Sequence, residues 1–398
     1  MTTPHRGFPR ALLEESLPSR LQYFRTLTVA HPHLVQANEK LLEAILESPP
    51  NSVVLVYGPT GVGKTTLCVK VQQMLTNRFL SDLPKDAGRI PVVSVEAVAP
   101  ESGNFSWKDH FKRLLSQMDE PLIKYKIAAA GGQEHTTYQR FTPAAKAVGS
   151  EYRYAVEQAL CFRSPLAVLI DEAQHLAKMA SGRRLLDQLD VIKSIANRSS
   201  TVHVLFGTYE LLAFRNLSGQ LSRRSIDLHF RRYLADDDKE RQIFVNVLRS
   251  FEQHLPFPEP PELAKHWEFL YERSVGCIGI LKEWLTKALS AALRNDETSL
   301  SLRHLEDHAA SVAQCQKVLS EVVEGERRLT ETAEGRASLR MHLGLPRSSI
   351  ERVDPSKAAG ETDSRASVST ERRTARRPGV RLPVRDAIGK PEFANVGD

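Results

Sequence analysis

The sequence has few cysteines and no long apolar run, and each scarcity excludes a class of protein. Its 398 residues include four scattered cysteines without paired spacing, which argues against a disulfide framework or a zinc site. No apolar run reaches the length that crosses a membrane, and the first residues, MTTPHRGFPR, lack the apolar core of a signal peptide. We therefore expect a soluble bacterial protein of the cytoplasm, without a membrane partner.

The remaining composition is that of a folded chain with more than one domain. A length of 398 residues exceeds what one domain normally needs, and 41% apolar residues can form a substantial core. The formal net charge of +6 permits a polyanionic partner but does not require one.

A phosphate-binding loop follows the first apolar run. Residues 53–56 (VVLV) predict a buried parallel strand, and residues 58–65 (GPTGVGKT) match G-x-x-x-x-G-K-[ST] at every fixed position. In such loops the glycines let backbone N–H groups face phosphate oxygens, the lysine reaches the β- and γ-phosphates, and the hydroxyl ligates Mg²⁺. We therefore predict contacts with ATP, and with Mg²⁺ through Thr65, from a continuous stretch: Gly58, Pro59, Thr60, Gly61, Val62, Gly63, Lys64, Thr65 and Thr66.

A second motif, LAVLIDEAQ, places two carboxylates after a predicted buried strand at residues 166–170. Ligands of open α/β sheets bind at this end of the strands. Asp171 suits the Mg²⁺ shell, directly or through water, and Glu172 suits activation of the water that attacks the γ-phosphate. A kinase or small-molecule transferase would not need the second carboxylate here, so the pair favours ATP hydrolysis. The alternative is an acidic pair that caps the following helix.

Three further residues are candidates for catalysis beside Glu172. Thr208 follows a predicted strand at residues 202–206, where its hydroxyl can bond the γ-phosphate or the attacking water, or can simply cap a helix. Arg223 and Arg224 precede a predicted strand at residues 226–230. In an assembly one of them would reach the γ-phosphate of the neighbouring copy and stabilise transition-state charge, whereas otherwise they form a solvated basic pair.

The chain divides into four segments by pattern. Strands alternate with helices over residues 51–235, which predicts an α/β domain with a parallel five-stranded sheet. Residues 1–50 are expected to form a loose arm to about residue 20, then helices broken at His31-Pro32 that flank the nucleotide. Residues 236–324 carry only helical periodicity, so we expect an α-helical lid domain. Residues 325–398 are basic and poor in large apolar side chains, which predicts a mostly disordered tail.

These motifs, in this order and spacing, resemble those of the TniB/TnsC-type transposition ATPases of the AAA+ superfamily. The shared elements are HPHLVQANEKLLEAI, GPTGVGKTT, LAVLIDEAQHL, VLFGTYEL, SRRSIDLHF and SVGCIGILKEWL. The resemblance covers about residues 20–315 and implies an AAA+ P-loop fold with a helical lid. It also places Lys282, in a helix opened by Gly276 and Gly279, near the ATP, although many AAA+ proteins have an arginine there.

The resemblance implies a regulator of DNA transposition in heteromeric, TnsABC-like transposons, including CRISPR-associated ones. Such proteins are slow ATPases controlled by DNA or by a partner. They assemble on double-stranded DNA as rings or helical filaments with a hexamer or heptamer per turn, and are nucleoid-associated when bound. They link a target selector of the TnsD/TniQ type to the transposase, and a neighbour's arginine completes the ATP site.

In this family the DNA contacts come from the region between the two phosphate-site motifs. Here that region is basic, with interleaved aromatic residues between about residues 119 and 150. A solvated surface charge is an equal alternative for each candidate taken alone. The candidates for DNA contact are Lys108, Lys112, Lys124, Lys126, Arg140 and Lys146.

Rival classes make different demands on the sequence. A DEAD/DEAH-like helicase needs a second α/β motor, which the helical pattern after residue 236 does not supply. A secretion-type ATPase with a DEAQ motif should carry a membrane-spanning helix or a wall-binding module. A nucleotide switch that binds proteins and no DNA remains open, and binding of duplex DNA distinguishes it.

Overall fold

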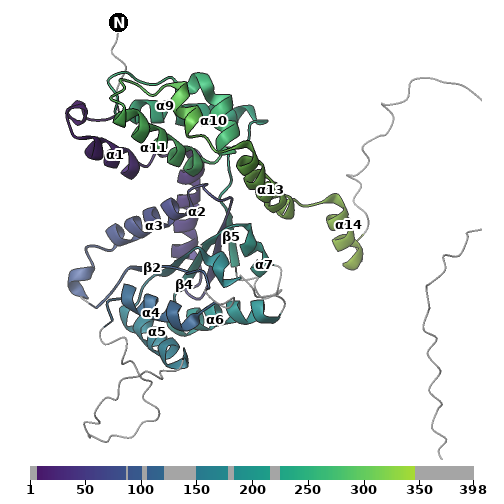
Figure 1. The fold of residues 1–398 in the computed structure, drawn as a ribbon. Helices are drawn as coiled ribbons and strands as arrows, with labels where there is room; N and C mark the ends of the chain where they lie inside the picture. Colours follow the sequence, from purple (N-terminus) through teal and green to yellow (C-terminus); the bar gives the residue numbers. More distant parts are fainter. Residues whose placement is uncertain are drawn as a thin grey trace, which may run out of the picture. The chain divides into compact units, whose positions relative to one another are not determined.

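The computed structural model describes residues 7–86, 88–100, 105–120, 149–177, 183–215 and 225–345 (Figure 1). Two compact units make up the chain, Met1–Glu331 and Thr332–Asp398. The phosphate loop, both carboxylates and the helical region all belong to the first unit.

A parallel sheet forms the centre of the first unit. Among the described residues it has five strands in the order β2–β3–β4–β1–β5, all parallel, which confirms the predicted sheet. Because β4 lies between β1 and β3, the residues that follow β4 are next to those that follow both neighbours. The strands are β1 Val53–Tyr57, β2 Val92–Glu96, β3 Ala167–Asp171, β4 Val202–Gly207 and β5 Ser225–His229.

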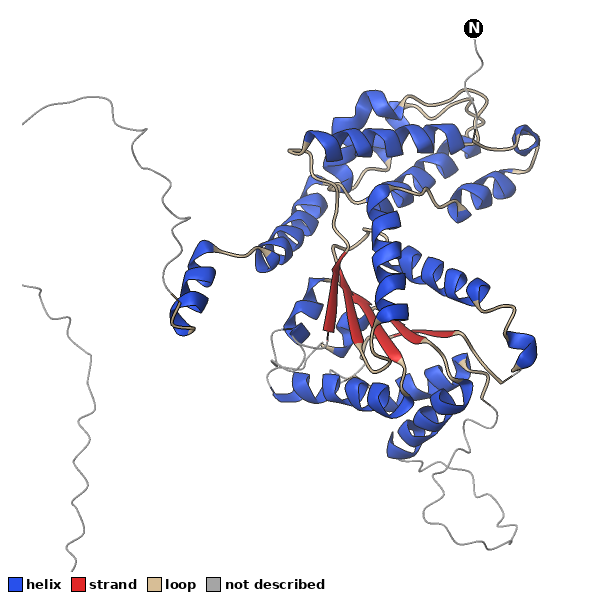
Figure 2. Ribbon diagram, turned by 180° about the vertical axis from the view of Figure 1, so that it is seen from behind, coloured by secondary structure: helices blue, strands red, loops and turns tan. Residues whose placement is uncertain are grey.

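Helices cover both faces of the sheet (Figure 2). Successive side chains of a strand point to opposite faces, so Val54 and Val56 of β1 pack with α2 (Pro32–Glu47) and α3 (Lys64–Arg78). Val53 and Leu55 pack on the opposite side of the sheet. The helices on that side are α4 Trp107–Gln117, α5 Gly149–Arg163, α6 Arg183–Ser199 and α7 Leu212–Arg215. Burial on both faces explains why these strands are continuously apolar.

A helical region with its own apolar core follows the sheet. Its helices are α9 Asp238–His254, α10 Trp267–Ser274, α11 Ile278–Arg294, α12 Leu302–Asp307 and α13 Val312–Leu329. A single helix is predicted over residues 302–320, but Ser311 and Gln314 form a capping box that starts α13 separately from α12. None of the helices in the described part of the chain combines the length and apolar character needed to span a bilayer.

The N-terminal residues differ from the loose arm expected to about residue 20. Phe8 and Leu12 are buried, and the N–H of Gly7 donates to the carbonyl of Gln253 at 3.0 Å. The next helix, α1 (Leu17–Thr26), packs Phe24 against Phe251 within the core of the helical region. A few isolated apolar residues without periodicity are enough to dock this segment, and such a pattern cannot be recognised in one sequence.

Helical structure also continues beyond residue 325, where the sequence predicts the tail to begin. Gly325 lies inside α13 and is buried, and α14 spans Ala333–His342 in the second unit. A Cβ on Gly325 would lie 2.2 Å from the ring of Tyr209, so α13 packs closely on the segment after β4. Residues 346–398, which hold most of the predicted tail, lie outside the described part of the chain.

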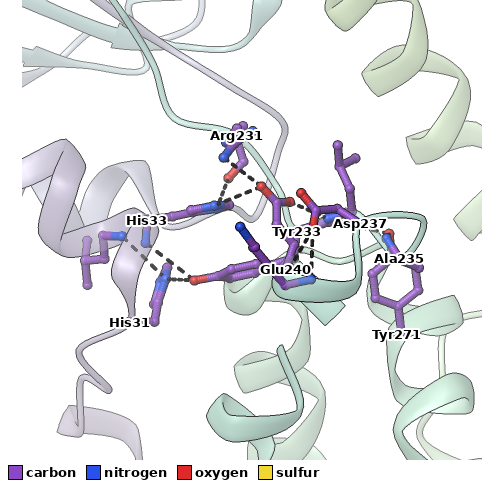
Figure 3. A network of polar contacts seen from close by, with 11 residues as sticks. His31, His33, Arg231, Tyr233, Ala235, Asp237, Glu240 and Tyr271 are labelled. Carbon is purple, nitrogen blue, oxygen red and sulfur yellow. Dashed lines mark hydrogen bonds and ion pairs between the residues drawn. The ribbon is translucent and has the colours of Figure 1, made fainter. Parts of the chain in front are cut away.

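A buried polar network fixes the junction between sheet and helical region (Figure 3). Nδ1 of His31 lies 2.9 Å from the Tyr233 hydroxyl and accepts the N–H of Leu34, so the proton of this ring is on Nε2. Glu240 accepts from Arg231 at 2.7 Å and lies 3.5 Å from Nε2 of His33. The network connects α2, the segment after β5 and α9, and thereby holds the helical region in place beside the sheet.

Burial lowers the pKa of three histidines, His31, His110 and His203, to about 4. In the unfolded chain their pKa is near 6.5. Between pH 6.5 and pH 4 the unfolded state therefore binds more protons, and the free energy of unfolding decreases as the pH falls. Each histidine contributes at most about 1.4 kcal/mol per pH unit to this decrease.

We predict that His110→Leu makes the protein less sensitive to acid. Nδ1 of His110 has no hydrogen-bond partner within the described residues, so the substitution removes a titrating group without leaving a partner unpaired. Between pH 7 and pH 5 the variant should lose about 2 kcal/mol less unfolding free energy than wild type, measured by urea unfolding. His342→Leu, at an exposed position, controls for loss of an imidazole. An equal loss in wild type and His110→Leu would contradict the prediction.

Candidate nucleotide-binding site

The loop after β1 has the backbone of an anion-binding site. Gly61 and Gly63 have φ values of 73° and 114°, a left-handed region that glycine adopts without steric cost. Gly63 is the N-cap of α3, so the free N–H groups and the positive end of this helix adjoin the loop. The side chains of Thr60 and Thr65 are exposed at the same place and can meet a ligand.

Lys64 is the buried cation of this loop. Its side chain belongs to a residue only 8% exposed, and Nζ donates to the carbonyls of Gly58 at 3.1 Å and Pro59 at 2.8 Å. Burial lowers the pKa of Lys64 to about 8, against the opposing negative charges of Glu172 and Asp171. A buried ammonium bound by neutral carbonyls is poorly compensated, so the site fits a strongly anionic ligand such as a triphosphate.

The two carboxylates lie at a sharp bend after β3. Oδ1 of Asp171 accepts the N–H of Glu172 at 2.9 Å, and Glu172 has a φ of 53°, in the left-handed region. This conformation costs about 1 kcal/mol or more for a residue with a side chain, and such strain is concentrated at functional sites. Glu172 precedes a short 3-10 helix, Ala173–Leu176, but its side chain makes no capping hydrogen bond there. The contacts thus do not support the alternative in which Glu172 caps a helix.

Thr208 performs the capping role and also faces the site. Its hydroxyl oxygen accepts the N–H of Glu210 at 3.4 Å, at the start of the 3-10 helix Tyr209–Leu211. A hydroxyl that accepts at its oxygen still has a proton to donate. Thr208 lines a cavity of about 390 Å³ together with Pro59 and Thr60 of the phosphate loop. Thr208 can therefore cap the 3-10 helix and still donate a hydrogen bond to the γ-phosphate or to the attacking water, so the two alternatives are compatible.

Gln174, the last residue of LAVLIDEAQ, has no predicted role. In the structure its amide lies between the two strand ends, because Nε2 donates to Glu172 and Oε1 accepts the N–H of Thr208 at 3.3 Å. Gln174 lines the same cavity and is buried. The motif contains Gln174 and Glu172 together, so their contact is local. Thr208, which follows β4, is brought to Gln174 only by the fold.

The helical region contacts the phosphate loop through the start of α11. The N–H of Ile280 donates to the carbonyl of Gly61 at 3.1 Å, and a Cβ on Gly279 would lie 2.3 Å from that oxygen. Glycine at residue 279 therefore permits the close approach of helix and loop. Lys282, on the same helix, donates to the carbonyls of Arg25 and Leu27 at the end of α1. These two bonds direct the ammonium of Lys282 to the end of α1. Its contact with nucleotide stays a prediction.

A second side of the cavity is formed by α13. Arg232 donates to both carboxylate oxygens of Glu326, at 3.0 and 3.1 Å, which attaches α13 to the chain just after β5. This bidentate pair has favourable geometry for an Arg–carboxylate contact. Arg328 of α13 also lines the cavity. Glu326 and Arg328 are not among the predicted site residues, since the predicted tail begins at residue 325.

The remaining predicted site residues fall into two groups. Lys108 and Lys112 lie one turn apart on α4, with Nζ 5.8 and 5.3 Å from the centre of the Tyr152 ring, so they share one face. The other candidates lie outside the described residues, and their roles remain predictions. They are Arg223, Arg224, Lys124, Lys126, Arg140 and Lys146.

The sheet order, the phosphate loop and the helical region define the AAA+ P-loop fold, as the sequence predicts. Residues 50–214 match the protein family described as "AAA domain". This match includes the loop, both carboxylates and Thr208. A comparison with curated proteins found no match.

Several solved structures are similar to this chain at low sequence identity. The ORC2 protein of Aeropyrum pernix, in ADPNP and ADP complexes, is 16% identical with a TM-score of 0.47, over 74% of this chain and 71% of that one. The ORC1 protein of Aeropyrum pernix, in complex with DNA, is 18% identical with a TM-score of 0.48, over 72% and 68%. The Walker-type ATPase paby2304 of Pyrococcus abyssi is 16% identical with a TM-score of 0.45, over 77% and 80%. Likenesses of this strength do not define a function.

We predict that affinity for ATP falls as the pH rises above about 8. Above that value Lys64 in the empty site loses its proton, so binding of the triphosphate must take up a proton from solution. The dissociation constant should then rise by at most about tenfold per pH unit, measured by titration calorimetry between pH 7 and 9.5. Lys64→Ala should show no measurable binding at any pH. Wild-type affinity in that variant would refute the assignment of the loop.

Proposed function

We propose that this protein is an ATPase whose activity is slow and regulated by DNA or by a protein partner. The observation that carries the proposal is the arrangement of Lys64, Asp171 and Glu172 at the ends of β1 and β3. The pKa of the buried Lys64 ammonium responds to the charge of both carboxylates, so the three groups act on one small volume. This is the set of charges that ATP hydrolysis requires.

Each residue has a distinct task in this reaction. Lys64 and the N–H groups of the loop would bind the phosphates of ATP, and the carboxylate of Glu172 would orient the attacking water and accept its proton. The hydroxyl of Thr208 would donate to the γ-phosphate or to that water. Thr65 and Asp171 would hold Mg²⁺, which neutralises phosphate charge when bound.

We predict that Glu172→Gln binds ATP with near wild-type affinity and hydrolyses it at least about 100-fold more slowly, because an amide cannot accept the proton of water. Hydrolysis would be measured by phosphate release. If ATP maintains an assembly, electron microscopy of this variant with ATP and duplex DNA should show long-lived rings or filaments. Normal turnover would remove Glu172 from its role.

The specific proposal for the biological role is regulation of DNA transposition. It is supported by the ordered motifs that resemble the TniB/TnsC type, and by the placement of Lys108 and Lys112 on one face of α4. In this proposal, copies assemble on double-stranded DNA, and Arg223 or Arg224 of one copy completes the ATP site of the next. The assembly then connects a target selector of the TnsD/TniQ type with a transposase.

We predict that Lys108→Glu/Lys112→Glu lowers affinity for duplex DNA and flattens its dependence on salt. Each lysine–phosphate contact contributes about 0.9 to the slope of log affinity against log salt, so the slope should fall by up to about 2 per protomer. Binding would be measured by anisotropy with ATP and with ADP.

The control variant for this measurement is Lys265→Glu/Lys287→Glu, which changes the net charge equally at exposed positions of the helical region. An identical slope in both double variants would place the DNA site elsewhere. If the wild-type protein hydrolyses ATP but does not bind duplex DNA, the alternative of a nucleotide switch for protein partners is correct.

A further inference from the structure

We propose that Gln174 is a positioning residue that holds the carboxylate of Glu172 beside the end of β4. Its amide donates a hydrogen bond to Glu172 and accepts one from the N–H of Thr208. The inference rests on the proposed ATPase function, since it assigns a task within that reaction. It extends the function by connecting Glu172 to Thr208 through a single side chain.

The two hydrogen bonds determine which way the amide points. A backbone N–H can only donate, so the atom of Gln174 that faces Thr208 at 3.3 Å is the oxygen. The amide nitrogen is then directed at Oε2 of Glu172, to which it donates. An ionised carboxylate only accepts hydrogen bonds, so donor and acceptor match at both ends.

The surroundings of the amide are built to accept it. Gln174 is 7% exposed, and a buried amide is costly unless both ends are bonded. A Cβ on Gly207, the last residue of β4, would lie 2.6 Å from Oε1 of Gln174. Strand β4 therefore ends in glycine at the point where the amide of Gln174 passes. On either side, Ala173 and Leu176 are fully buried in the core beneath the sheet and fix the short helix.

Glu172 needs such a partner because a competing one is nearby. The charge of Glu172 acts on the Lys64 ammonium, and a direct ion pair between them would use up the cation that binds phosphate. A hydrogen bond to a carboxylate is charge-assisted and stronger than one between neutral groups. The bond from Gln174 thus favours the position of Glu172 on the β4 side, where Thr208 lines the cavity with the phosphate loop.

Two variants separate the functions of the amide. Gln174→Glu keeps an oxygen for the N–H of Thr208 but loses the donor to Glu172 and adds a like charge. Gln174→Met has a similar length and loses both hydrogen bonds. The control is Gln188→Met, which removes another amide that is bonded to Trp107, on α6 and away from the cavity.

The experiment measures kcat, KM and the ATP dissociation constant of the full chain, with and without duplex DNA, at constant pH. Both Gln174 variants should lose about 10- to 100-fold in kcat, the range expected when a reacting group loses its orienting partner, and less than about threefold in ATP affinity. The loss should fall on kcat and not on ATP affinity, because the amide is bonded to Glu172 and to the end of β4 and not to the phosphate loop. Gln188→Met should retain the wild-type kcat and ATP affinity.

The possible results are distinct. Wild-type kcat in both Gln174 variants would overturn the inference and leave the ATPase proposal intact. Wild-type kcat in Gln174→Glu together with a loss in Gln174→Met would show that only the bond to Thr208 matters, which also overturns it. If Gln174→Met fails to fold, Gln174→Glu alone decides, because the inference requires its kcat to fall while its ATP affinity is retained. A wild-type protein without turnover would overturn the ATPase proposal itself.

Discussion

The site depends on one buried positive charge. The ammonium of Lys64 is enclosed at the start of α3 and has backbone carbonyls of its own loop as hydrogen-bond partners. Removing a charge from water is costly, and neutral carbonyls offset only part of that cost. The protein thus carries an electrostatic cost at the loop. In the proposed function an incoming polyphosphate would offset that cost, and this offset would be a large part of the affinity for ATP.

The order of the strands determines what this charge can act on. Because β4 separates β1 from β3, the phosphate loop and the two carboxylates lie on either side of the end of β4. Gln174 joins the residues after β3 to the end of β4 through Glu172 and Thr208, and the contact of Ile280 with Gly61 joins the helical region to the loop. A change at the loop therefore reaches the helical region through a single hydrogen bond, and Pro59 and Thr60 of the loop line one cavity with Gln174 and Thr208. In the proposed function these are the contacts that a nucleotide-dependent switch would use.

The sequence predicted those parts of the site whose signal is local. The apolar strands, the glycine loop with Lys64, and the acidic pair after β3 are each contained in a few consecutive residues. Contacts between distant residues gave no such signal, because Gln174 meets Thr208 from another strand and Lys282 meets Arg25 across most of the chain. The prediction of a loose arm around Phe8 is wrong for the same reason, since this segment is bonded to α9, far along the chain. Sequence patterns report the burial of a face, but not which surface covers it.

The close packing of Gly325 against Tyr209 has a mechanical consequence. With no side chain between them, helix α13 rests directly on the residue that follows Thr208, and the Arg232–Glu326 pair clamps the same helix one residue further on. Tension applied to the C-terminal end of α13 would therefore be transmitted through Tyr209 to the end of β4. In the proposed function, a partner that pulls on the end of α13 would thereby act on the hydrolytic site.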